Sequence, residues 1–127
     1  MNSKKKILIV DDDQFMRELL TVKLEENGYE VSSVSEGLLA LQTIRDHKPD
    51  LVLLDILLPG LSGLETLNVL RAEELGQHLP IILISNLNEP ELIRVAERLG
   101  ADDYLVKPFT AELLIEKIKE IIGFEVL

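Results

Sequence analysis

The chain has 127 residues, of which 46% are hydrophobic and 28% are charged, as is typical of one globular domain. Its 23 acidic and 13 basic side chains give a formal net charge of −10, which argues against direct binding of nucleic acid. Cysteine is absent, which excludes disulfides and thiolate metal sites. The first apolar run, residues 7–10, is too short for a secretion signal or a membrane span, so we expect a cytoplasmic protein.

Five apolar segments have the length of strands and are separated by helical patterns. They are Ile7–Val10, Glu30–Val34, Leu51–Leu54, Ile81–Ile84 and Tyr104–Val106. The third and fourth do not alternate with polar residues, as expected for parallel strands that helices cover on both faces.

Apolar residues recur at helical spacing between these segments. In the first interval, we expect one side of a helix to be formed by Phe15, Leu19, Val22, Leu20 and Leu24. Later helices are indicated by Leu64, Leu67 and Leu70, by Leu92, Ala96 and Leu99, and by Leu114, Ile118 and Ile121.

Helix boundaries are marked by residues with defined backbone preferences. Gly28 and Gly100 are expected to follow helix ends in the left-handed conformation. Pro90 suits the first turn of a helix, and Thr110 suits the N-cap of the last one.

Five strand–helix units predict an α/β protein with right-handed crossovers and an open, doubly wound parallel sheet. Only residues 124–127 follow the last predicted helix, so we expect a single domain over 1–127 and no effector domain in this chain. In such sheets, ligands bind beyond the carboxyl ends of the strands.

Polar residues close four of the five predicted strands: Asp11 and Asp12, Asp55, Ser85, and Lys107. Two carboxylates about 4 Å apart repel each other by roughly 4 kcal/mol at a protein surface, so a raised pKa or a bound cation must offset the repulsion. An oxygen-only ligand set favours Mg²⁺, or Mn²⁺, over zinc. A carboxylate nucleophile could then accept a phosphoryl group that Lys107 and Ser85 hold in place.

Three segments, residues 7–13, 50–63 and 100–109, together resemble a response-regulator receiver domain of the CheY-like class from two-component signalling. The resemblance covers nearly the whole chain. It implies a flavodoxin-like fold with strand order 2-1-3-4-5. It also implies a phosphorylated switch module, which acts only on its own phosphorylation and is not an enzyme for other substrates.

The resemblance makes Asp55 the phosphoacceptor, supplied by the phosphohistidine of a sensor histidine kinase or phosphotransfer protein. It makes Asp11, Asp12, Asp55 and the Leu57 backbone carbonyl the metal ligands. Ser85 and Lys107 would bind the phosphoryl group, and Tyr104 would be the aromatic residue that turns inward when Ser85 moves. The Lys107–Pro108 bond is expected to be cis, and Asp13 is interpreted as a helix cap.

The sequence departs from the family pattern beside the expected site. Asn86 stands where the family usually has Ala or Gly, and it should crowd access to Asp55. Leu57 and Leu87, two residues beyond Asp55 and Ser85, cannot hydrogen-bond an attacking water. Slow self-dephosphorylation is therefore expected.

In receivers of this family that are fused to DNA-binding domains, the output face formed by the fourth helix, fifth strand and fifth helix often dimerises through charged pairs. This sequence departs from that pattern. Asp102, Asp103 and Lys117 fit that pattern, but Ile93 and Leu113 replace charged residues. A phosphorylation-dependent homodimer and the docking of a downstream protein on an apolar patch both stay open.

Three other functions share features with this sequence. A haloacid-dehalogenase-type phosphatase needs a second acid where Leu57 stands, and a flavin-binding flavodoxin needs a hydroxyl-rich loop where the acidic residues 11–13 stand. A degenerate receiver that only docks partners is disfavoured by the intact Asp55, Ser85 and Lys107.

Overall fold

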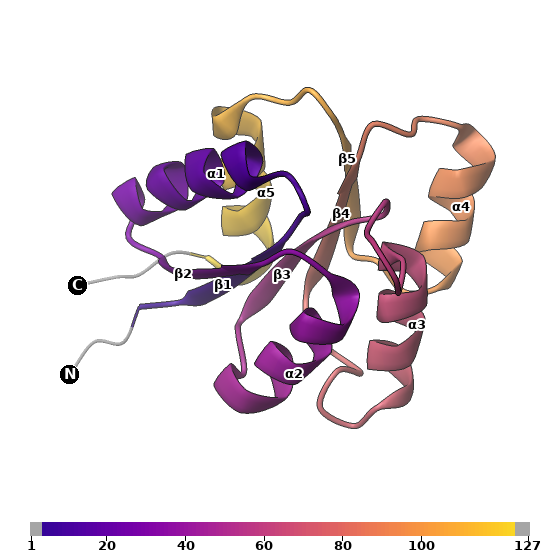
Figure 1. The fold of residues 1–127 in the computed structure, drawn as a ribbon. Helices are drawn as coiled ribbons and strands as arrows, with labels where there is room; N and C mark the ends of the chain where they lie inside the picture. The colour runs from indigo at the N-terminus through magenta and orange to yellow at the C-terminus, as the bar shows by residue number, and fades with distance from the viewer. Residues whose placement is uncertain (1–3, 124–127) are drawn as a thin grey trace.

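Five parallel strands form one sheet in the order β2-β1-β3-β4-β5 (Figure 1). The strands are β1 (Lys6–Val10), β2 (Glu30–Val34), β3 (Leu51–Asp55), β4 (Ile81–Ser85) and β5 (Asp103–Val106). The structure is a computed structural model that describes residues 4–123. Residues 124–127, expected to follow the last helix, lie outside the described residues.

A helix follows each strand and covers one face of the sheet. The helices are α1 (Gln14–Glu26), α2 (Gly37–His47), α3 (Gly63–Ala72), α4 (Pro90–Arg98) and α5 (Ala111–Ile122). Figure 1 shows α1 and α5 on one side of the sheet and α2, α3 and α4 on the other. The predicted flavodoxin-like (βα)5 fold and its strand order are confirmed. No helix within residues 4–123 combines the length and apolarity needed to cross a membrane.

The core has two layers because the central strands are buried on both faces. Leu8, Val10, Val52 and Leu54 pack in the layer with α2, α3 and α4. Their strand neighbours, such as Ile7 and Leu53, pack in the layer with α1 and α5. This two-sided burial explains why β3 and β4 do not alternate apolar with polar residues.

The predicted helix boundaries are confirmed. Gly28 and Gly100 have φ values of 90° and 100°, in the left-handed region that glycine tolerates best. Pro90 begins α4, and the Thr110 hydroxyl accepts the Leu113 N–H at 3.1 Å to cap α5. Asp13 caps α1 by accepting the Met16 N–H at 3.3 Å.

One expectation about α1 is wrong. Leu20 and Leu24 are buried, but Phe15, Leu19 and Val22 are 64%, 44% and 53% exposed. At 3.6 residues per turn, the two sets lie on nearly opposite sides of a helix, so one packing surface cannot cover both. α1 therefore presents an apolar stripe to solvent, which we call the α1 stripe and define as Phe15, Leu19 and Val22.

Candidate functional site

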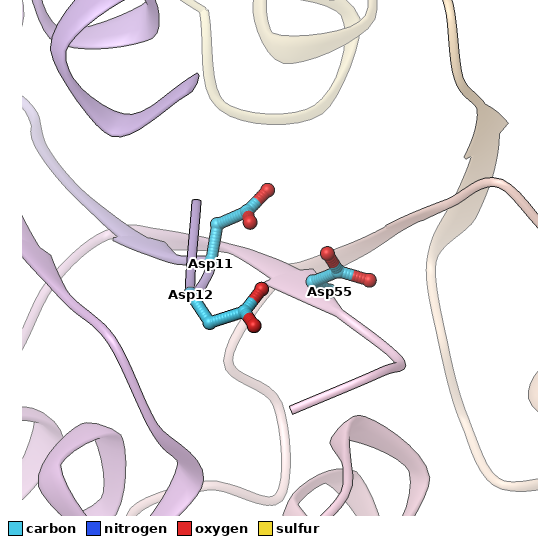
Figure 2. A group of neighbouring side chains, drawn as sticks. All are labelled: Asp11, Asp12 and Asp55. Carbon is cyan, nitrogen blue, oxygen red and sulfur yellow. The ribbon is translucent and has the colours of Figure 1, made fainter. Parts of the chain in front are cut away.

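The carboxyl ends of β1 and β3 bring three carboxylates together. Val10 pairs with Leu54 on the adjacent strand, so the residues that come next, Asp11 after β1 and Asp55 at the end of β3, lie at the same edge of the sheet. Figure 2 shows the side chains of Asp11, Asp12 and Asp55 gathered beyond these strand ends. One carboxylate oxygen from each lies within 4.8 Å of the other two, as the sequence predicts.

Lys107 joins two of the three carboxylates. It follows β5, and its Nζ donates to Asp11 Oδ2 at 2.8 Å and to Asp55 Oδ2 at 2.9 Å. The Asp11 side chain is fully buried, and those of Lys107 and Asp55 are 11% and 8% exposed. The Lys107–Pro108 peptide bond is cis, as the resemblance implied.

Burial and the contacts between Lys107 and the carboxylates have opposite effects on the pKa values of Asp55 and Lys107. Burial raises the pKa of Asp55, and the negative charge of Asp11 adds to this, although Lys107 and the Leu57 N–H oppose it. For Lys107, burial lowers the pKa, but hydrogen bonds and charges from Asp11 and Asp55 outweigh burial and raise it overall. The ammonium is therefore held charged between two carboxylates.

The loop after β3 is tied closely to Asp55. The Leu57 N–H donates to Asp55 Oδ1 at 3.1 Å, and the Gly63 N–H donates to the Ile56 carbonyl at 2.8 Å. A Cβ on Gly63 would overlap the Asp55 carbonyl oxygen, so only glycine lets α3 begin this close to the strand. The Leu57 side chain is 57% exposed beside the site.

Ser85 and Tyr104 meet at the loop after β4. Ser85 is buried, and its Oγ accepts the Leu87 N–H at 3.1 Å. The Tyr104 hydroxyl donates to the Leu87 carbonyl at 2.6 Å. Burial raises the pKa of this hydroxyl, against a smaller opposing effect of Ser85. Both residues therefore hold the same loop residue, while Asn86 between Ser85 and Leu87 is exposed.

The loop after β1 contains a contact that sequence reasoning missed. Arg17, on the first turns of α1, donates from Nη1 to the Asp11 backbone carbonyl at 2.8 Å. The Asp13 N–H donates to Asp11 Oδ1 at 3.0 Å. Periodicity could not signal Arg17, because its partner is a backbone atom in the preceding loop.

The charged residues of the expected dimer face pair within the chain. Asp102 Oδ2 lies 3.2 Å from Arg71 Nη2, and it also accepts the Ile81 N–H at 2.8 Å. Asp103 Oδ2 lies 3.4 Å from Lys117 Nζ. These carboxylates already have partners, so fewer charges are left for a neighbouring molecule.

The donor set fits a small divalent cation. Asp11, Asp12 and Asp55 supply only hard oxygen ligands, which Mg²⁺ and Mn²⁺ prefer. Lys107 offsets one of three negative charges, so a dication would balance the other two. Asp12 is exposed and makes no hydrogen bond or ion pair within residues 4–123, which leaves its oxygens available for coordination.

Comparison with known proteins agrees with this geometry. Residues 7–119 match the response regulator receiver domain family. The DNA-binding response regulator MtrA of Mycobacterium tuberculosis is 35% identical over 116 residues, which cover 91% of this chain and 50% of that protein. The phosphate regulon transcriptional regulatory protein PhoB of Pseudomonas aeruginosa is 41% identical over 118 residues, 93% of this chain and 52% of that protein.

The fold is matched by solved structures as well. The chemotaxis response regulator CheY4 of Vibrio cholerae superimposes with a TM-score of 0.89 at 28% identity, covering 94% of this chain and 100% of that one. The chain thus spans about half the length of the two curated relatives named above, and the match covers the whole of the CheY4 chain.

Proposed function

Because the chain belongs to the response regulator receiver domain family, we propose that it is a phosphorylation switch with Asp55 as the phosphoacceptor. The phosphoryl donor is the phosphohistidine of a sensor histidine kinase or phosphotransfer protein. One observation carries the proposal: Lys107 bridges Asp11 and Asp55 at the sheet edge, with Asp12 beside them. We infer a cytoplasmic location from the same role.

In the transfer step, an oxygen of Asp55 attacks phosphorus as the bond from phosphorus to the imidazole nitrogen breaks. The imidazole leaves and keeps the electron pair of that bond, and Asp55 becomes an acyl phosphate. Mg²⁺ or Mn²⁺, held by Asp11, Asp12, Asp55 and the Leu57 carbonyl, would supply positive charge for the phosphoryl oxygens. Lys107 adds its own charge and Ser85 its hydroxyl.

Switching follows from the loop that Ser85 and Tyr104 share. A phosphoryl group on Asp55 draws the Ser85 hydroxyl toward it, which moves the loop at Leu87 to which Tyr104 is bonded. The population shifts toward an arrangement that already exists at a low level. The output face formed by α4, β5 and α5 then changes its affinity for a downstream protein.

Two surfaces support separate docking events. The α1 stripe lies on the helix that follows Asp11 and Asp12, where an apolar surface suits the phosphodonor protein. On the output face, Val95 and Leu113 are each 39% exposed, while Asp102 and Asp103 pair internally. This favours docking of a downstream protein over a homodimer held by charged pairs. In this proposal the chain does not bind nucleic acid directly, because its net charge is negative.

The test is incubation with acetyl phosphate and Mg²⁺, read by intact mass. We expect one phosphoryl adduct on the wild-type chain, and none on Asp55→Asn or after chelation of the metal. No adduct on the wild-type chain would refute the proposal and favour a receiver that acts only by docking. Continuous release of phosphate with no adduct would favour a phosphatase.

A further inference from the structure

Arg17 contacts the peptide unit that links the two metal-ligand candidates Asp11 and Asp12. Its guanidinium donates to the Asp11 carbonyl oxygen at 2.8 Å. A peptide unit is planar, so holding this oxygen also sets the direction of the bond to the Asp12 Cα. The Asp12 side chain follows that backbone.

Other contacts hold Asp11 but not Asp12. The Asp11 N–H donates to the Val34 carbonyl at 3.2 Å, and its side chain contacts Lys107. The exposed Asp12 carboxylate makes no hydrogen bond or ion pair within the described chain. The Asp13 N–H, which follows Asp12 in the chain, donates to Asp11 Oδ1 at 3.0 Å. The place of Asp12 in the cluster therefore depends on the backbone on either side of it, and Arg17 holds the peptide unit that precedes it.

Arg17 itself is held firmly and is not used elsewhere. It is half-buried, its backbone N–H donates to the Asp13 carbonyl at 3.0 Å, and its own carbonyl accepts the Thr21 hydroxyl at 2.7 Å. Among residues 4–123 it makes no ion pair. Within the same residues, the only side-chain hydrogen bond of Arg17 is the one to the Asp11 carbonyl.

We propose that Arg17 is a positioning residue for divalent-cation binding, because it orients the Asp11–Asp12 peptide unit and so aims Asp12 into the site. This rests on the function proposed above. Residues that orient metal ligands typically change metal affinity by about 10- to 100-fold when they are removed.

The direction in which Mg²⁺ affinity changes distinguishes a positioning role of Arg17 from a simple effect of its charge. Removing a positive charge near a cation site should by itself tighten Mg²⁺ binding, because a repulsion is lost. Positioning makes the opposite prediction. We expect Arg17→Gln to raise the Mg²⁺ dissociation constant about tenfold, measured by calorimetric titration with MgCl₂. Arg17→Lys, which keeps the positive charge and a donor nitrogen, should give a smaller loss.

The control is a second arginine that binds backbone carbonyls away from the site. Arg71 donates to the carbonyls of Gly76, Leu79 and Gly100. Arg71→Gln should lower the stability of the fold and leave the Mg²⁺ dissociation constant within twofold of wild type. An unchanged or lower dissociation constant in folded Arg17→Gln would overturn the proposal, and so would an equal loss in Arg71→Gln.

A double-mutant cycle shows whether Arg17 acts through Asp12. In an Asp12→Asn background, Arg17→Gln should change the residual Mg²⁺ affinity less than twofold. An effect as large as in the wild-type background would contradict the proposed route.

A metal-free measurement separates this inference from the proposed function. NMR amide signals of Asp12 and Asp13 should shift in Arg17→Gln and stay in place in Arg71→Gln. If wild-type protein binds no Mg²⁺, the metal part of the proposed function fails, and these signals still decide whether Arg17 orients the loop. Unmoved signals would overturn the inference alone.

Discussion

Lys107 Nζ lies 2.9 Å from Asp55 Oδ2, and the same ammonium lies 2.8 Å from Asp11 Oδ2. Lys107 thus partly neutralises the carboxylates that are proposed to bind a dication. Its charge both stabilises the buried acids without metal and competes with metal for the same oxygens.

Replacing Lys107 with methionine should therefore have two effects. Without Mg²⁺, Lys107→Met should lose about 3 kcal/mol of unfolding free energy, because the fully buried Asp11 loses its partner. Added Mg²⁺ should stabilise this variant more than it stabilises wild type. Urea unfolding with and without MgCl₂ measures both. Lys117→Met, which breaks the more exposed pair with Asp103, is the matched control and should cost less than about 1 kcal/mol.

Leu57 offers a test of the expected slow dephosphorylation. Its exposed side chain cannot hydrogen-bond water, whereas Leu57→Asn should orient an attacking water and speed the decay of phospho-Asp55 by about tenfold. Decay can be followed by intact mass after removal of the donor. Leu75→Asn, at another exposed leucine in the loop after α3, should leave the rate unchanged. Wild-type decay within seconds would contradict slow dephosphorylation.

The α1 stripe predicts a difference between large and small phosphodonors. Leu19→Glu should slow transfer from a phosphorylated histidine phosphotransfer domain by about tenfold, because it places a charge in an apolar contact. Transfer from acetyl phosphate should not change, since that donor needs no docking surface. Val95→Glu on α4 is the control at a similarly exposed apolar position. Equal slowing with both donors would mean that the substitution damages the site itself.

The raised pKa values of Tyr29 and Tyr104 predict how the stability of the fold changes at alkaline pH. Burial raises the pKa of both Tyr29 and Tyr104, so each phenol stabilises the fold while it is protonated. That stabilisation is complete below the ordinary pKa of about 10 and is lost as pH rises through the raised value. The ultraviolet absorbance of phenolate should therefore develop above pH 10 in the folded chain.

Tyr29→Phe isolates one of these groups. The Tyr29 hydroxyl donates to the Gly123 carbonyl at 2.9 Å, so its loss should cost about 1 kcal/mol at neutral pH. Above pH 10, this variant should lose stability less steeply than wild type, measured by urea unfolding across the pH range. Parallel pH profiles would show that Tyr29 does not titrate as its burial implies.

The ion pairs on the output face predict the oligomeric state of the phosphorylated protein. Because Asp102 and Asp103 pair with Arg71 and Lys117 in the same chain, we expect phosphorylated protein to elute as a monomer in size-exclusion chromatography. A shift to a dimer that Asp55→Asn abolishes would instead support the charged homodimer.

The sequence by itself determined the class of fold and the residues of the candidate site. Strands of uninterrupted apolar residues require helices on both faces, and parallel strands bring their carboxyl ends to one edge. Asp11, Asp12, Asp55, Ser85 and Lys107 all follow or close such strands, so their position was predictable from chain order alone.

Only the tertiary structure decided which side chains meet which backbone atoms. Periodicity marks apolar positions but not which of two helix sides is covered, so the prediction that Phe15, Leu19 and Val22 share one helix side with Leu20 and Leu24 is wrong. The contacts of Arg17 and Arg71 join side chains to carbonyls of distant loops, and every residue type carries such a carbonyl. A carbonyl partner leaves no mark in the sequence, so the contact of Arg17 is decided only by the packing of α1 beside the loop that follows β1.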